Sequence, residues 1–359
     1  MVESARTESP ERTRRPSARR IQRRQRTRRR VVALLLAAAT LVAVTVLSAN
    51  APGPPTLLSA VGSGPSHLDS GSPRMLPGNI LVADRGNNRL AVISPRGQVA
   101  WSEHIKAPTN AFVAPTERSV IVTQRTLSVV LRYGINNGVL NYHYGRPDWP
   151  GKGANRLSQP SAAQQLRDRR LVVADETSCR ILLLAPPVRR PARVFGRAGV
   201  CVHDPPASFA HPDSAFPTSG NWIVVTERKP AWVDVLSSGG RLIWAVRVRG
   251  ISAPMDANEF AAGRIVVTGH SQPGAVEELA RGGAVLWRYA PTSGAGELSF
   301  PSLAQVLPDG NVLVTDSGDD RVVVIDRHTD AIVWQYGHTG VPGRRAGYLD
   351  SPDGAVVVP

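Results

Sequence analysis

Residues 302–336 read SLAQVLPDGNVLVTDSGDDRVVVIDRHTDAIVWQY, and this stretch contains four short apolar runs separated by turn residues. The runs cover 302–307, 311–316, 321–326 and 331–336. They are rich in Val and Ile, which favour strands, whereas the Gly, Asp and Pro residues between them favour tight turns. The stretch therefore predicts four short β-strands joined by turns.

The same pattern recurs along the chain. Each copy opens with Pro-x-x-Ala, which stands at Pro108–Ala111, Pro160–Ala163, Pro212–Ala215, Pro254–Ala257, Pro301–Ala304 and Pro352–Ala355. An apolar run ends twelve or thirteen residues after the alanine, as at Asp175 and Asp316, and an aromatic residue follows 17 to 20 residues later. The copies succeed one another every 42 to 52 residues. Four-stranded units of this length in series predict an all-β fold, a six-bladed β-propeller.

The two ends of the repeat region complement each other. The last copy has only its first strand, Ser351–Pro359, and the first copy begins at Pro77 without a first strand. We therefore expect the C-terminal strand to be the innermost strand of a blade whose outer three strands come from residues 77–104, with Val356 beside the strand around Val82. Closure of this kind removes the exposed sheet edges that favour aggregation.

Two families of repeats are similar to this sequence over residues 76–359. The segment Asp84–Arg89 matches the D-x-G-N-N-R turn of NHL repeats, and 316–321 is a looser copy. The segment 326–334 resembles the D-x-x-T-G-x-x-x-W pattern of quinoprotein-type (PQQ-like) repeats, with Asp330 in place of Gly. The resemblance implies a propeller but leaves the activity open, because such propellers include sensors, scaffolds, lyases, lactonases and dehydrogenases.

The turn that carries the NHL-like motif has an acid and an arginine at its ends. The pairs are Asp84 with Arg89, Asp175 with Arg180, and Asp316 with Arg321. We expect each pair to hold its turn together through hydrogen bonds and opposite charge.

The N-terminal quarter of the chain has a different composition. Residues 1–30 form an Arg-rich tail, 31–49 contain no charge and are just long enough to span a bilayer, and 50–75 are a linker rich in Gly, Pro and Ser. The pattern, in a composition typical of bacteria, predicts a signal-anchor helix with its N-terminus in the cytoplasm and the propeller at 76–359 outside. The alternative is a signal peptide that is cleaved near Ala51, which would release a secreted domain.

The positive charge of the chain is concentrated in that tail. Residues 1–30 carry +9 of the formal net charge of +15. The tail contains no aromatic residues that could stack on bases, so we predict contact with anionic lipid and no nucleic-acid partner.

The chain has two cysteines, Cys179 and Cys201. Both fall on the same face of the predicted propeller, and an oxidising compartment favours a disulfide. The strands that precede them are roughly 10 Å apart, whereas a disulfide needs Cα atoms within about 7 Å. The connecting loops could supply the difference, so the sequence leaves the disulfide open.

The same face collects histidines and inner-strand acids. The histidines are His143, His203, His211, His270 and His338, and the acids near the axis are Asp213, Asp256, Glu259 and Asp353. From these we select candidates for a ligand site at the mouth of the axial channel: His211, Asp213, Asp256, His270 and Asp353. We predict no metal site, because the histidines come from different blades and share no spacing.

These features favour a binding or scaffold module over an enzyme. The sequence contains no G-x-S-x-G, H-E-x-x-H or phosphate-loop motif, so we predict no catalytic residue and no cofactor. The expected partners are the membrane and a protein or glycan of the cell envelope. The alternative is a metal- or cofactor-dependent enzyme of the lactonase, lyase or quinoprotein kind that uses the axial channel.

Overall fold

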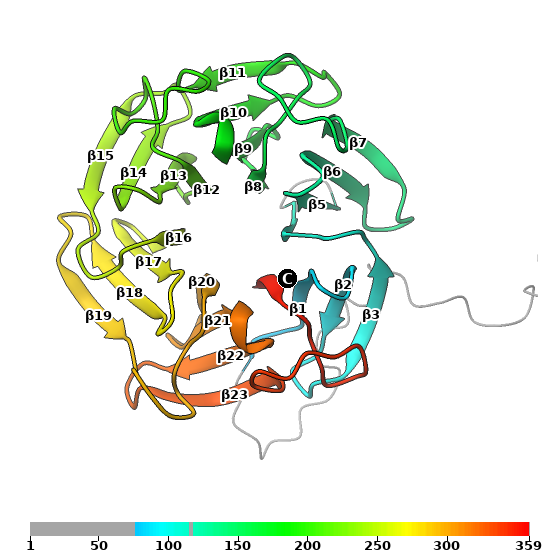
Figure 1. Cartoon of the computed structure of the whole chain (residues 1–359), viewed down its shortest axis with the longest axis vertical. Coiled ribbons are helices and arrows are strands. Elements are labelled where there is room, and N and C mark those ends of the chain that lie inside the picture. The colour runs from blue at the N-terminus through cyan, green and yellow to red at the C-terminus, as the bar shows by residue number, and fades with distance from the viewer. Residues whose placement is uncertain (1–75, 115–117, 359) are drawn as a thin grey trace, which may run out of the picture. The chain divides into compact units, whose positions relative to one another are not determined.

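A computed structural model describes residues 76–114 and 118–358 of the chain. In these residues six four-stranded antiparallel sheets surround a central axis (Figure 1). The predicted tail, membrane-spanning helix and linker at 1–30, 31–49 and 50–75 lie outside the described residues. Among the residues that the structure describes, no helix has the length and apolar character needed to cross a bilayer.

The blades are numbered here in the order in which the chain first enters them, and their strands are given from the axis outward. Blade 1 consists of β24 (Pro352–Val357), β1 (Ile80–Asp84), β2 (Arg89–Ile93) and β3 (Val99–His104). Blade 2 consists of β4 (Asn110–Val113), β5 (Ser119–Gln124), β6 (Val129–Gly134) and β7 (Leu140–Gly145). Blade 3 consists of β8 (Pro160–Gln165), β9 (Leu171–Asp175), β10 (Arg180–Leu184) and β11 (Pro191–Phe195). Blade 4 consists of β12 (Pro212–Pro217), β13 (Trp222–Glu227), β14 (Trp232–Ser237) and β15 (Leu242–Arg247). Blade 5 consists of β16 (Pro254–Ala261), β17 (Arg264–Gly269), β18 (Ala275–Ala280) and β19 (Val285–Tyr289). Blade 6 consists of β20 (Pro301–Val306), β21 (Val312–Asp316), β22 (Arg321–Asp326) and β23 (Ala331–Gly337). Short 3-10 turns, η1 (Glu176–Ser178) and η2 (Ser317–Asp319), follow the second strands of blades 3 and 6.

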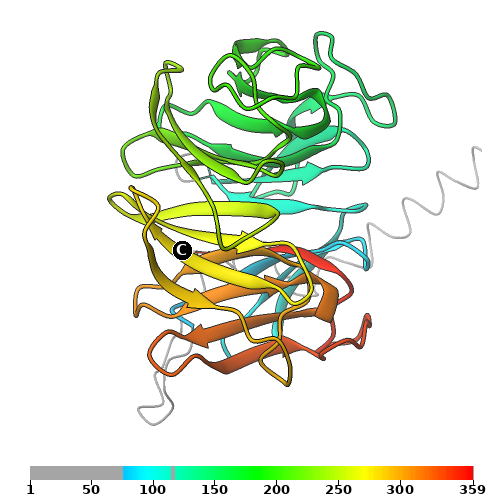
Figure 2. The ribbon, with the colours of Figure 1, turned by 60° about the vertical axis from the view of Figure 1, so that its left-hand side comes forward.

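The predicted six-bladed architecture and its closure are confirmed. Strand β24 pairs antiparallel with β1, so that Val82 lies opposite Ala355 and Leu81 opposite Val356. Figure 2 shows the same ring turned by 60°, with the red C-terminal strand beside the cyan strands of blade 1. The N- and C-terminal ends of the propeller therefore form one sheet.

The hydrophobic core is divided among the contacts between neighbouring blades. One buried cluster, for example, combines Val82 and Ala355 of blade 1 with Leu313 and Val324 of blade 6. The alanine of each Pro-x-x-Ala is at most 2 % exposed, and its small side chain lets the inner strands approach the axis. Trp334 packs against this same cluster and donates from Nε1 to the Pro95 carbonyl at 3.1 Å.

The three Asp–Arg pairs hold their turns as expected. Nε of the arginine lies 2.6 Å from the carboxylate of Asp84, 2.7 Å from that of Asp175 and 2.8 Å from that of Asp316. Each arginine also donates to backbone carbonyls of the connection that leads into the inner strand of its own blade, as Arg321 does to the Glu297 carbonyl at 2.6 Å. The pair thus fixes both the turn and the connection between blades.

Candidate functional site

One end of the axis carries the turns between second and third strands and the connections between blades, and we call this end the upper face. The inner strands bend where they enter it. In β8, β12, β16, β20 and β24 the pairing register skips the residue after the first proline. Such a β-bulge re-aims one side chain. The skipped residues are Ser161, Asp213, Met255, Ser302 and Asp353, and Thr109 precedes β4 at the equivalent position.

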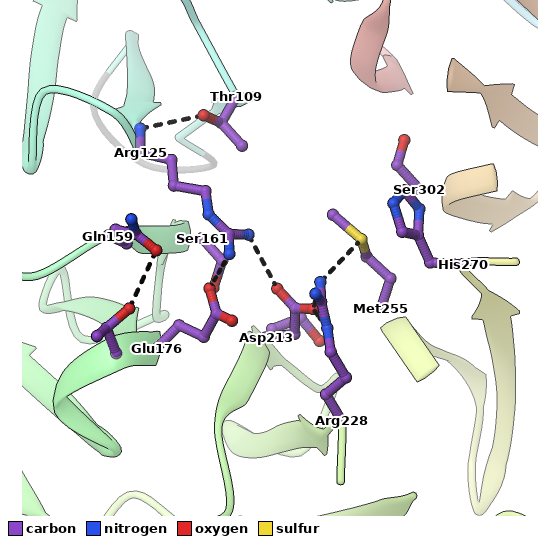
Figure 3. A network of polar contacts seen from close by, with 12 residues as sticks. Thr109, Arg125, Gln159, Ser161, Glu176, Asp213, Arg228, Met255, His270 and Ser302 are labelled. Carbon is purple, nitrogen blue, oxygen red and sulfur yellow. Dashed lines mark hydrogen bonds and ion pairs between the residues drawn. The ribbon is translucent and has the colours of Figure 1, made fainter. Parts of the chain in front are cut away.

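A second set of side chains reaches the same place from the second strands. Each blade contributes the residue that follows the end of its second strand: Arg85, Arg125, Glu176, Arg228, His270 and Ser317. Contacts join the two sets, for example between the Ser317 and Ser302 hydroxyls at 2.8 Å. We call these twelve residues the axial ring. Figure 3 shows many of them around the axis.

Ion pairs across three blades dominate one side of the axial ring. Arg125 pairs with Glu176 and also lies 3.6 Å from Oδ1 of Asp213 (Figure 3). Arg228 donates from Nε to Oδ2 of Asp213 at 2.7 Å. Asp213 is 2 % exposed and is therefore a buried carboxylate held between two guanidinium groups. This geometry keeps both arginines in place.

The remaining acids near the axis are also buried. Asp353 lies 3.5 Å from Nε of Arg85, and burial raises the pKa of Asp353 to about 6 although three arginines oppose the rise. Burial, followed by the charge of Asp213, raises the pKa of Glu176. Protonation of Asp353 near pH 6 would change the charge of the axial ring.

His270 is the titratable base of the axial ring. Burial, followed by the charge of Arg228, lowers its pKa, so the imidazole is neutral at pH 7. Its Nδ1 lies 3.4 Å from the Pro301 carbonyl, and its ring lies 5.3 Å from that of Phe300. A neutral imidazole in this position can contact a ligand or accept a proton from it.

The structure brings together three of the five predicted ligand residues. Asp213, His270 and Asp353 belong to the axial ring. Asp256 follows the bulge at Met255, faces blade 6, and accepts from Asn258 at 2.7 Å, with burial raising its pKa well above the usual range. His211 lies apart from the ring, because a left-handed backbone turn (φ 58°) directs it to Cys179, 4.0 Å from the sulfur.

The other residues that we placed on this face make separate contacts. His143 approaches Arg189, His338 packs on Tyr348, and His203 approaches Glu227. Glu259 lies at the opposite end of its inner strand, where it accepts from Ser219. The charged residues of the axial ring that sequence analysis missed are the three arginines and Glu176. Their shared signal is the position directly after the landmark that ends each second strand.

The two cysteines form a disulfide. Cys179 and Cys201 are bonded, with Cα atoms 5.2 Å apart. Cys179 has a left-handed conformation at the end of η1, and Cys201 lies in the connection between β11 and β12. The bond ties this connection, residues 196–211, to blade 3.

The lower end of the axis differs in chemistry from the upper end. It has a cavity of about 340 Å³ that is lined by apolar side chains such as Phe112 and Phe260 and by the polar side chains Gln164, Asn258, Glu259 and Gln305. A separate hollow of about 510 Å³ on the upper face borders Arg228 and three further cations, Lys229, Arg247 and Arg249. Cationic side chains therefore line the hollow on the upper face, whereas the lower cavity has none.

Known proteins support the fold. A family model described as outer membrane protein assembly factor BamB, of the PQQ-like repeat type, matches residues 203–358, in line with the PQQ-like resemblance. A protein of unknown function from Bacteroides caccae is 16% identical, with a TM-score of 0.54 over 72% of this chain and 93% of that chain. Virginiamycin B lyase from Staphylococcus aureus, in an inactive variant with quinupristin, is 11% identical, with a TM-score of 0.50 over 71% and 83%. The Kuenenia stuttgartiensis hydrazine synthase is 14% identical, with a TM-score of 0.52 over 73% and 79%.

At these identities the solved structures share the fold alone. No curated protein matches the sequence.

Proposed function

We propose that the protein is a membrane-tethered, extracytoplasmic β-propeller that binds another protein of the cell envelope through its upper face and does not catalyse a reaction. The observation that carries this proposal is the charge pairing within the axial ring. Its three arginines and three acids contact one another, so each acid has an arginine partner.

This pairing favours a partner that carries both donors and acceptors. The ring has no excess of either sign when all six groups are ionised, so a small anion or cation gains little from its net charge. A polypeptide loop, in contrast, can offer hydrogen-bond donors to the acids and acceptors to the arginines at the same time. The ion pairs also hold the arginine side chains in place before binding, so less conformational entropy is lost when a partner binds.

Exposed apolar side chains around the ring support a protein partner. Four connections between blades each carry one such side chain, namely Trp149, Val202, Phe300 and Val341, which are 55%, 57%, 41% and 50% exposed. The Trp149 ring is flanked by Arg146 and Arg156, whose guanidinium carbons lie 5.4 and 4.4 Å from the ring centroid. Tryptophan and arginine are enriched at the centres of protein interfaces.

The envelope location rests on the sequence of the N-terminal quarter. The uncharged run at 31–49 and the preceding Arg tail support a single membrane span with the propeller outside. The family model that matches residues 203–358 is described as an outer membrane protein assembly factor, which supports an envelope partner. Protease added to intact cells should digest the propeller and spare the tail. Digestion of the tail in intact cells would contradict this topology.

An enzyme remains the second candidate because of His270 and Asp353. A neutral imidazole and a carboxyl whose pKa is about 6 line the same mouth, and such a pair can exchange protons near pH 7. The alternative is a metal- or cofactor-dependent enzyme of the lactonase, lyase or quinoprotein kind; the sequence contains no G-x-S-x-G or H-E-x-x-H motif, so this pair is the observation that favours catalysis.

Cross-linking in the native host tests the binding proposal. We expect the full-length protein to cross-link to one envelope protein, and Trp149→Ala with Phe300→Ala to reduce that product at least tenfold. Leu242→Ala with Val285→Ala is the matched control, because these exposed side chains lie at turns between third and fourth strands, on the opposite face. Equal loss in both double variants, a glycan as the captured partner, or turnover that requires His270 would overturn the proposal.

A further inference from the structure

Blade 4 lacks the Asp–Arg pair that stabilises blades 1, 3 and 6. Glu227 ends its second strand, and the residue opposite is Trp232. In the other three blades an arginine occupies this position opposite the acid. The buried carboxylate of Glu227 therefore has no guanidinium partner from its own turn.

A second buried acid lies beside Glu227. Asp234 occupies a position in β14 that is apolar in blades 1, 3 and 6, where Ala91, Leu182 and Val323 stand. Asp234 and Glu227 are both 0 % exposed. Glu227 accepts from the Ala210 amide at 2.5 Å, whereas neither carboxylate oxygen of Asp234 has a hydrogen-bond partner. Burial of an ionised carboxylate without a partner is unfavourable in free energy, so a positive charge beside Asp234 would stabilise the folded protein.

A histidine completes the cluster from a different part of the chain. Nδ1 of His203 lies 3.1 Å from Glu227 and 4.0 Å from Asp234, and the three side chains each offer a ligand atom within 4.8 Å of the others. The His203 ring stacks on Trp232 with centroids 4.1 Å apart. His203 follows Cys201 by two residues, so the disulfide holds the connection that delivers it. Packing and a covalent bond thus fix the imidazole over the two acids.

We propose that His203, Glu227 and Asp234 bind one divalent transition-metal ion, Zn²⁺ or Mn²⁺, which fixes the connection at residues 196–211 to blade 4. One imidazole and two carboxylates are ligands that these ions accept, and two negative charges match one divalent cation. Ligands about 2.1 Å from one ion lie roughly 3.4 Å apart in a tetrahedron, close to the spacing of this cluster. His203 is 20% exposed, which leaves access for water as a fourth ligand.

A second cluster on the same connection differs in a decisive way. Cys179, Cys201 and His211 also come together, but the two sulfurs are bonded to each other and are not thiolate ligands. His211 therefore supplies a matched control on the same connection, provided that reductant is absent.

The rival state of the His203 cluster holds a proton in place of the metal. Burial, followed by the proximity of Glu227, raises the pKa of Asp234 well above its usual range. A shared proton would relieve the repulsion between the two carboxylates without any ion. A metal titration separates the two states, because only one of them predicts stoichiometric binding.

The test uses the full-length protein, treated with chelator and kept without reductant. Calorimetric titration with Zn²⁺ and with Mn²⁺ should show one equivalent bound by at least one of them, and the bound ion should raise the melting temperature. Asp234→Asn keeps the shape of the side chain and should weaken binding at least tenfold, as should His203→Gln. His211→Gln should bind like the wild type.

Two results would overturn the metal site. One is a wild-type protein that binds neither ion stoichiometrically at micromolar concentration, whether or not Asp234→Asn changes the stability. The other is a folded Asp234→Asn variant that binds with wild-type affinity. Neither result bears on the cross-linking experiment, because the upper-face variants leave this cluster intact.

Discussion

Val82 and Ala355 lie directly opposite each other in β1 and β24, although they come from the two ends of the propeller. Both are completely buried, in a cluster that also contains Leu313 and Val324 of the neighbouring blade. Blade 1 is therefore complete only when the last residues of the chain have joined it. The stability of the whole ring should depend on this contact, since closure removes two open sheet edges.

Deletion of residues 352–359 should destabilise the entire propeller. The deletion exposes the edge of β1 and the clusters on either side of blade 1. We expect a lower denaturation midpoint and a smaller m-value, because less surface would be buried in the remaining fold. Chemical denaturation followed by tryptophan fluorescence measures both. Removal of residues 1–8 is the length-matched control, and an unchanged midpoint in the C-terminal deletion would disprove the role of closure.

Arg321→Ala should cost about 3–5 kcal/mol of unfolding free energy, because it leaves the buried Asp316 carboxylate without its partner. Arg321 is 1 % exposed and also donates to carbonyls that lead into blade 6. Arg170→Ala breaks a solvent-exposed pair with Asp168 and should cost less than about 1 kcal/mol. Equal losses in the two variants, measured by urea denaturation, would show that burial does not set the strength of these pairs.

The fold could be predicted because its determinants repeat. Strand positions, the Asp–Arg turns and the pairing of Val356 near Val82 all follow from apolar runs at constant offsets from Pro-x-x-Ala. The strand expected at 302–307 begins one residue earlier, at Pro301, where the bulge starts. Local pattern and repeat length determine these features, so sequence alone suffices for them.

The axial ring was harder to predict because its residues do not repeat. The position after each second strand is Arg85 in blade 1 but Glu176 in blade 3, and a search for repeated features discards such positions. Their meaning arises only when six blades bring them to one mouth. The bulge that turns Asp213 toward Arg228 also has no signature of its own in the sequence.

Replacing Cys201 with Ser should cost about 2–4 kcal/mol of unfolding free energy, since the disulfide closes a loop between residues 22 positions apart. The exposed Val202 directly follows Cys201, so the disulfide also holds the connection at residues 196–211 on the upper face. Denaturation under non-reducing conditions measures the loss, and reduction of the wild type should reproduce it. A wild-type protein that reacts with a thiol reagent after denaturation without reductant would contradict the disulfide itself.

Asp353 should make the propeller less stable as the pH rises from 4 to 6. Burial raises its pKa in the folded protein from 3.8 to about 6, so in this window the folded state binds the proton and the unfolded state has released it. The unfolding free energy then falls with increasing pH, by at most about 3 kcal/mol for this group, and levels off above pH 6. Asp353→Asn cannot titrate, so its stability relative to the wild type should increase over the same interval. Urea denaturation of both proteins at pH 4, 5, 6 and 7 measures this difference. A difference that stays constant with pH would mean that Arg85, 3.5 Å away, keeps Asp353 ionised throughout.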